Sequence, residues 1–275
     1  MKIYKRIFDN WKKEQTRILH QYGFDVAEGC DVFKIYDKNV YFELRDLFKK
    51  WDSSETLGID FTKKEILSAQ YCIINKWRPY GYPMPDDDFG YLNLTYDKDK
   101  MCNKCGSNSV QKDVFRVRKV PKYPMWCLEW VYDELFVRKD LYEKIFKPLG
   151  IECRSLRKYK DDSVIDSYVQ LVIPVIEEPL DLSSYQSQKC SVCGTVKYDV
   201  EVQGYFPLQE HPLPYIYKSK EYFGDGFDAD RKIFVSGKVR DLMIENGLIK
   251  LIDFVPCAKS NELDILNQDL LEWEK

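Results

Sequence analysis

Four of the nine cysteines form two pairs with the same spacing, a spacing that suits a metal ion. In each pair two residues separate the cysteines and a glycine follows directly. Two intervening residues let a tight turn direct both thiolates at one ion, and the glycine can take a positive φ. Two such turns, which we call knuckles, supply a closed tetrahedral site. The pattern predicts one structural zinc ion, bound by Cys102, Cys105, Cys190 and Cys193.

The 84 residues between the two knuckles far exceed the spacing of a compact zinc ribbon, so the metal would join segments remote in sequence. A redox dithiol motif, a disulfide and an iron–sulfur cluster are the alternatives. The redox motif would begin a helix, whereas Cys102 lies in a turn-like context, and disulfides are disfavoured in the cytoplasm. Four thiolates also leave no coordination position for a catalytic water.

The other five cysteines are scattered singly among apolar or aromatic neighbours. Such cysteines usually act as small buried hydrophobic residues rather than reactive thiols. We expect this of Cys30, Cys72, Cys127, Cys153 and Cys257.

The segments 134–151 and 232–249 resemble each other at a constant separation of 98 residues. Each has an extended Phe-Val start, apolar residues at helical spacing and a hydrophobic exit segment. Ser236 is placed to cap the second helix. With one knuckle ahead of each segment, the pattern predicts two related halves with the zinc ion near the axis between them. Chance similarity of two amphipathic helices is the alternative. The matching pairs are Phe136 with Phe234, Val137 with Val235, Leu141 with Val239, Ile145 with Met243, and Phe146 with Ile244.

These patterns predict an α+β protein with mixed sheets and short helices, its two related halves joined by a split zinc-ribbon-like site of four cysteines. Helices are expected over 8–20, over 41–51, from 62 and from 260. Strands are expected over 31–36, 70–74, 91–96, 114–120, 127–131, 167–175 and 198–202. The predicted regions are an N-terminal helical or mixed region (1–78), a first half (79–180), a second half (181–260) and a C-terminal tail or helix (261–275).

Composition indicates a folded chain without a bulk attraction for polyanions. Hydrophobic residues make up 44% of the 275 residues, which is enough to build a core. The 42 basic and 45 acidic residues nearly cancel, so no overall pull towards nucleic acid or anionic lipid is expected. The sequence contains neither a signal peptide pattern nor an apolar run long enough for a membrane span. We therefore predict a cytoplasmic protein.

The residue inventory argues against an enzyme. The two histidines, His20 and His211, lie beside no candidate nucleophile, and no phosphate-binding loop or metalloprotease signature is present. Adjacent carboxylates such as Asp133 with Glu134 are typical of surface charge.

Two groups of acidic and aromatic residues have the composition of a recognition surface. Solvated loops with capping residues are the alternative interpretation. The first group is Tyr80, Tyr82, Asp86, Asp87 and Asp88, and the second is Tyr222, Phe223, Asp225, Asp228 and Asp230.

The two knuckles, together with residues 218–226, 233–236 and 252–256, resemble the bacterial double-CxxCG motif family over roughly residues 80–258. Members of that family are regarded as immunity proteins of polymorphic or contact-delivered toxin systems. The resemblance implies that this chain binds and neutralises a cognate protein toxin. Only the knuckles are specific motifs.

A zinc-ribbon nucleic-acid-binding protein is the second hypothesis, because knuckles often serve such modules. The acidic balance of the whole chain argues against nucleic acid as the partner. A basic face would be needed, and its candidates are Arg116, Arg118, Lys119, Lys122, Arg154, Arg157, Lys158 and Lys160.

Overall fold

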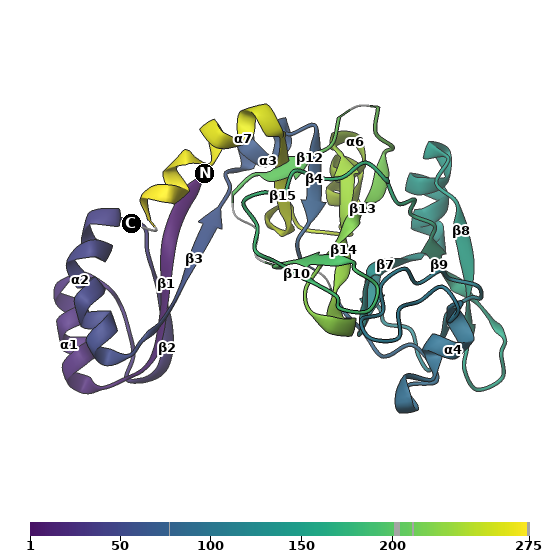
Figure 1. The fold of residues 1–275 in the computed structure, drawn as a ribbon, viewed down its shortest axis with the longest axis horizontal. Helices are drawn as coiled ribbons and strands as arrows, with labels where there is room; N and C mark the ends of the chain where they lie inside the picture. Colours follow the sequence, from purple (N-terminus) through teal and green to yellow (C-terminus); the bar gives the residue numbers. More distant parts are fainter. Residues whose placement is uncertain (77, 201–203, 211, 274–275) are drawn as a thin grey trace.

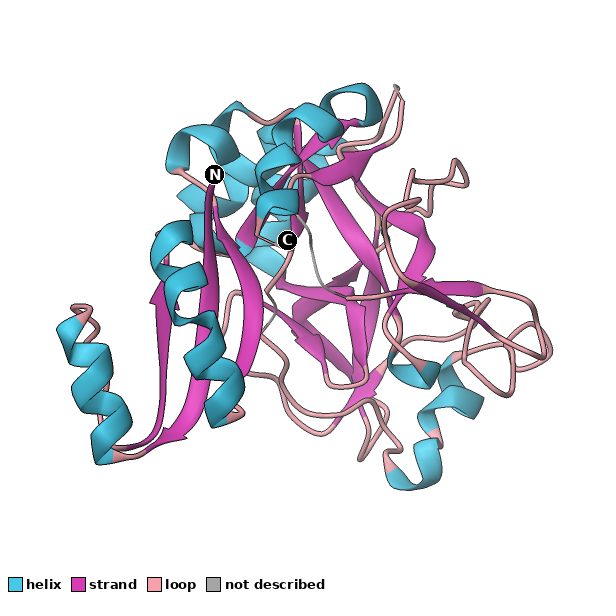
Figure 2. Ribbon diagram, turned by 60° about the vertical axis from the view of Figure 1, so that its left-hand side comes forward, coloured by secondary structure: helices cyan, strands magenta, loops and turns pink. Residues whose placement is uncertain are grey.

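The computed structural model describes residues 1–76, 78–200, 204–210 and 212–273. It is an α+β structure with curled sheets and short helices, as the sequence predicts (Figure 1). Three sheets are present in the described residues. Figures 1 and 2 show the N-terminal sheet beside the body that the two larger sheets form.

The N-terminal sheet has the antiparallel strand order β2-β1-β3. Its buried residues form a core of their own with helices α1 and α2, centred on Ile7, Leu44 and Phe48. Asp37 starts α2 by accepting hydrogen bonds from the next turn, as a capping carboxylate does. The elements are β1 (Lys2–Trp11), α1 (Lys13–Gln21), β2 (Gly29–Ile35), α2 (Lys38–Trp51) and β3 (Ser54–Asp60).

The helix predicted over 8–20 is wrong for its first residues, which belong to β1. The buried residues of β1 are Ile3, Ile7 and Trp11, and a spacing of four fits both a helix and a strand. The segment forms a strand because it pairs with β2 and β3, and a local sequence pattern does not reveal this pairing.

The other two sheets contain five and seven strands. The five-stranded sheet has the order β5-β8-β9-β7-β6 and contains β5 (Arg116–Val117), β6 (Met125–Leu128), β7 (Val131–Arg138), β8 (Cys153–Lys158) and β9 (Val164–Leu171). The seven-stranded sheet has the order β10-β11-β13-β14-β4-β15-β12 and contains β4 (Tyr71–Ile74), β10 (Ser187–Lys189), β11 (Val196–Tyr198), β12 (Phe206–Leu208), β13 (Ile216–Phe223), β14 (Asp230–Ser236) and β15 (Phe254–Lys259).

The two larger sheets share one succession of strands. The order β6-β7-β9-β8-β5 corresponds to β13-β14-β4-β15-β12, with three antiparallel pairings and one parallel pairing in each. The middle strand comes from a different position in the sequence in each sheet: β9 follows β8, whereas β4 precedes the whole second half. The boundary predicted at residue 78 therefore lies beyond a strand that pairs inside the second half.

The segment between the strand and the glycine that follows the helix is one residue longer in the first half. In the second half β14 leads directly into α6 (Gly237–Glu245), and Ser236 caps this helix by accepting from the Val239 N–H, as predicted. In the first half β7 leads into α5 (Lys139–Leu141), a π-helical turn (Tyr142–Phe146) and η3 (Lys147–Leu149). The glycines after the helices, Gly150 and Gly247, both have positive φ but are separated by 97 residues instead of 98. A π turn accommodates one extra residue, which accounts for the shift.

The remaining elements connect the sheets. The strand predicted over 91–96 is wrong, because Tyr91 and Thr95 are buried one helical turn apart in a short helix. Its alternation of apolar and polar residues resembles a strand, but Tyr91 follows a 3₁₀ turn and is not paired. These elements are α3 (Lys63–Ser68), η1 (Asp87–Phe89), α4 (Tyr91–Thr95), η4 (Gly226–Asp228), η5 (Leu251–Asp253), α7 (Ser260–Leu266) and η6 (Gln268–Glu272).

The C-terminal segment returns to the N-terminal sheet. A helix from residue 260 is confirmed as α7. Leu270 and Trp273 pack in the N-terminal core, where the Trp273 ring lies 5.8 Å from that of Tyr41. None of the helices in the described part of the chain has the length and apolar character that a bilayer crossing requires.

The single cysteines mostly behave as predicted. Cys72, Cys127 and Cys257 are buried and Cys153 is half-buried, whereas Cys30 is exposed at the start of β2. The expectation of burial is therefore wrong for Cys30.

One hydrophobic core lies between the two halves, and a buried ion cluster lies beside it. The core combines residues of β7 and β9 with residues of β14 and α6. Lys218 of β13 donates to Glu134 of β7 at 2.5 Å and lies 3.3 Å from the Asp133 carboxylate. Gln170 of β9 also donates to Glu134 at 2.9 Å. The adjacent carboxylates Asp133 and Glu134 are therefore not surface charge, in contrast to the expectation from sequence.

Replacing Lys218 with Met should lower the free energy of unfolding by about 3–5 kcal/mol, because two carboxylates would remain buried without their counter-charge. Urea denaturation measures this change. Lys220→Met is the matched control, because Lys220 is exposed and lies 3.9 Å from the exposed Glu177. That control should change stability by less than about 1 kcal/mol. Equal losses in both variants would contradict this account.

Candidate metal centre

The structure brings the four paired cysteines together. Their sulfur atoms all lie within 4.8 Å of one another. The Sγ atoms of Cys102 and Cys190 are 4.0 Å apart, and those of Cys105 and Cys193 are 3.6 Å apart. Thiolates bound at about 2.3 Å to a tetrahedral zinc ion lie about 3.8 Å from one another. The donor set and its spacing thus fit a four-sulfur metal site.

The first knuckle is a tight hairpin held by its own backbone. The Cys102 N–H donates to the Ser107 carbonyl and the Gly106 N–H donates to the Cys102 carbonyl, both at 2.9 Å. Gly106 has a φ of 70°, and Phe227 packs so closely on it that an added Cβ would lie 2.9 Å from the ring. Glycine at this position therefore serves both the turn and the packing.

The second knuckle repeats this geometry. The Cys190 N–H donates to the Thr195 carbonyl at 2.9 Å and the Gly194 N–H to the Cys190 carbonyl at 3.0 Å. Strands β10 and β11 flank this hairpin, and β11 attaches it to β13. Both pairs of cysteines thus occupy the same position in the same type of turn.

Hydrogen bonds to the two sulfur atoms of the second knuckle favour their metal-binding thiolate form. The N–H groups of Cys193 and Val192 lower the pKa of Cys190. The side chain and N–H of Thr195 lower the pKa of Cys193 to about 6. The pKa of Cys102 is raised instead: the Lys104 N–H lowers it, but burial and the nearby thiols outweigh that effect. Four thiolates this close repel one another unless a cation lies between them.

Contacts outside the sulfur cluster also join the two knuckles. Lys197 of β11 is buried and donates from Nζ to the Cys105 carbonyl at 2.6 Å and to the Gly226 carbonyl. Lys104 donates to the Ser191 hydroxyl of the other knuckle at 2.8 Å. Lys197 therefore ties the first knuckle and η4 to the strand that carries the second knuckle.

The first group of predicted contact residues surrounds η1. Tyr82 is exposed, and its ring lies 4.5 Å from that of Trp130. Tyr80 is half-buried against Trp126. Asp86 pairs with Arg118 at 2.8 Å, and both Asp87 and Asp88 are exposed.

The second group is divided between surface and interior. Tyr222 and Phe223, at the end of β13, are buried. Tyr222 accepts a hydrogen bond from the Asn108 N–H beside the first knuckle, and Phe223 packs in one core cluster with residues of β12. They do not form the exposed surface expected from sequence. Asp225 caps η4 and is exposed, as is Asp228, whereas Asp230 is half-buried.

Three arginines of the candidate basic face, Arg116, Arg118 and Arg157, pair with carboxylates, whereas its four lysines are exposed. Arg116 pairs with Asp113 at 3.0 Å and with Asp162 at 2.7 Å, and Arg157 also pairs with Asp162 at 2.6 Å. Arg154 donates to the Gln111 side chain at 2.6 Å.

His20 lies 3.0 Å from the Val26 carbonyl, and His211 lies outside the described residues.

Sequence reasoning missed four pocket residues beside the metal centre: Tyr91, Tyr96, Trp130 and Asp133. The one available signal was the acidic pair Asp133 and Glu134 within a strand that also contains Val131, Leu135, Phe136 and Val137. Comparisons of the chain with protein-family models, curated proteins and solved structures gave no match.

Replacing Lys197 with Met should lower the unfolding free energy by about 1–3 kcal/mol, because two buried carbonyl groups would lose their donor. Thermal unfolding measures the loss. Lys98→Met is the control, because Lys98 is exposed near the same knuckle. A neutral Lys197 substitution would show that this contact does not hold the knuckles together.

Proposed function

We propose that the chain binds one zinc ion through Cys102, Cys105, Cys190 and Cys193, and that the ion is structural. The observation that carries this proposal is the convergence of four thiol sulfurs from two matching hairpins within 4.8 Å. Zinc suits a closed set of four thiolates and leaves no position for a reacting water. The ion then acts as a staple between residues 88 positions apart.

We further propose that the stapled body is a binding protein that neutralises a protein toxin. The resemblance of the knuckles and of residues 218–226 to the double-CxxCG family supports this role. A rigid scaffold also favours inhibition, because little conformational entropy is lost when it binds a partner. The pairing of Arg116, Arg118 and Arg157 with carboxylates weighs against the nucleic-acid alternative.

Purified, reduced protein should contain one zinc ion per chain by elemental analysis. Cys105→Ser should lose the metal and much of the stability of the body, since structural zinc contributes on the order of 10 kcal/mol to folding. Cys193→Ser should do the same although Cys193 is exposed. Cys30→Ser is the matched control, because Cys30 is also exposed and lies in the N-terminal sheet. Full metal content in both knuckle variants would refute the site.

Co-expression tests the proposed partner. The product of an adjacent reading frame should be toxic alone, harmless with this chain, and recovered in complex with it. Protection should fall with Cys105→Ser and persist with Cys30→Ser. Toxicity that this chain leaves unchanged, with no complex formed, would refute the role for that partner.

A further inference from the structure

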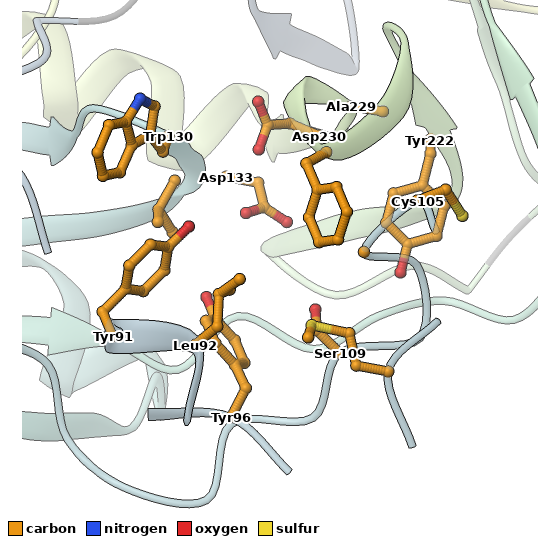
Figure 3. A pocket seen from close by; sticks show the side chains of 14 residues that line it. Tyr91, Leu92, Tyr96, Cys105, Ser109, Trp130, Asp133, Tyr222, Ala229 and Asp230 are labelled. Atoms are coloured by element: carbon orange, nitrogen blue, oxygen red, sulfur yellow. The ribbon is translucent and has the colours of Figure 1, made fainter. Parts of the chain in front are cut away.

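A small pocket opens beside the first knuckle, between the two halves (Figure 3). Its volume is about 60 Å³, room for a few water-sized groups. We call it the aromatic-acidic pocket. Its polar groups come from α4, β7 and β14, and its rings include Trp130, Tyr222 and Phe227.

Two carboxylates of this pocket come from different halves. Figure 3 shows Asp133 and Asp230 near each other at the pocket. Burial, and then the neighbouring Asp133, raise the pKa of Asp230 to about 8. Asp133 has Lys218 as a partner at 3.3 Å, but that ammonium group is closer to Glu134. The nearby ammonium groups are Lys218 and Lys232, against three carboxylates, Asp133, Glu134 and Asp230. When Asp230 is ionised, the cluster has one more negative than positive charge, in line with the raised pKa of Asp230.

Two tyrosines contribute hydroxyl groups to the pocket. Tyr91 and Tyr96 are 5% and 8% exposed, and both line the pocket. Figure 3 shows the Tyr91 hydroxyl pointing into the space between the labelled side chains. Within the described ranges, neither hydroxyl makes a hydrogen bond to a protein group. Neither oxygen is among the buried polar atoms without a partner, so both hydroxyls can be reached from the pocket. A phenol hydroxyl can both donate and accept a hydrogen bond, so these two groups suit a ligand with complementary polar atoms.

The rings add an attraction for cations. Trp130 lies over Tyr91 at 6.1 Å with an interplanar angle of 20°. Phe227 approaches from the side of the knuckle, whereas the Tyr222 ring already has the Arg231 guanidinium group over it at 4.3 Å. Aromatic faces attract ammonium and guanidinium groups through their quadrupoles, most strongly where water is excluded.

We propose that the aromatic-acidic pocket binds the guanidinium end of an arginine side chain presented by a protein partner. The guanidinium group would pair with Asp133 and with the ionised form of Asp230, which its charge would favour, and would offer N–H donors to the oxygens of Tyr91 and Tyr96. A protein partner follows from the proposed binding function, on which this inference rests. The pocket lies where both halves meet, so the staple would also preserve its shape.

The test uses zinc-loaded full-length protein and three probes: N-acetyl-arginine methylamide, its lysine counterpart and its neutral citrulline counterpart. Chemical shifts of the Trp130 indole N–H report binding. We expect the arginine probe to shift this signal at saturable concentrations and the citrulline probe to bind at least about tenfold more weakly, because it lacks the charge. Equal binding of both probes, or no response to the arginine probe, would overturn the inference. Stronger lysine binding would overturn the choice of arginine.

Two variants test whether the arginine probe binds in the pocket. Asp230→Asn removes the carboxyl group that would ionise beside the guanidinium group, and Tyr96→Phe removes only a hydroxyl. Each should weaken arginine binding while the zinc content stays at one. Asp166→Asn is the matched control, because Asp166 is exposed on β9 and is not among the pocket residues. Zinc-loaded Tyr96→Phe and Asp230→Asn proteins that bind the probe normally would refute this pocket. If protection against a toxin persists without probe binding, the inference fails and the proposed function stands; if the wild-type protein holds no zinc, the metal proposal fails first.

Discussion

The convergence of four cysteine sulfurs is the constraint on which the relation of the two halves depends. Each knuckle is locally complete, since its own backbone bonds close the turn. The turns themselves do not bring the two knuckles together, because thiolates a few ångströms apart repel each other without a cation. Two further hydrogen bonds join the knuckles to the sheet. Lys197 donates to the Cys105 carbonyl, and the Tyr222 hydroxyl accepts from the Asn108 N–H. A metal ion bound to the four sulfurs would therefore close an arrangement that the surrounding strands already hold.

The two halves are also joined by their strands and core. Strand β4 lies between β14 and β15, so a segment that precedes both knuckles completes the second sheet. The common core and the Lys218 ion cluster then link β13 to β7. Disruption of any one of these connections should affect both halves, because neither sheet has a separate core on the face they share.

Local patterns predicted the knuckles, the Ser236 cap and the strand-helix units of the repeat. Each depends on residues close together in sequence, and each has one strongly preferred conformation. Long-range pairing explains the failures: Ile3, Ile7 and Trp11 fit two periods, and only the partner strands of β1 decide between them. The pocket was missed for the same reason, because Asp133 and Asp230 are separated by a whole half of the chain.

X-ray absorption at the zinc edge tests the central claim most directly, because it reports the ligands of the bound ion. The account predicts four sulfur ligands at about 2.3 Å from one zinc ion in the reduced wild-type protein. A coordination shell with nitrogen or oxygen ligands would contradict the meeting of the two knuckles at a single closed site.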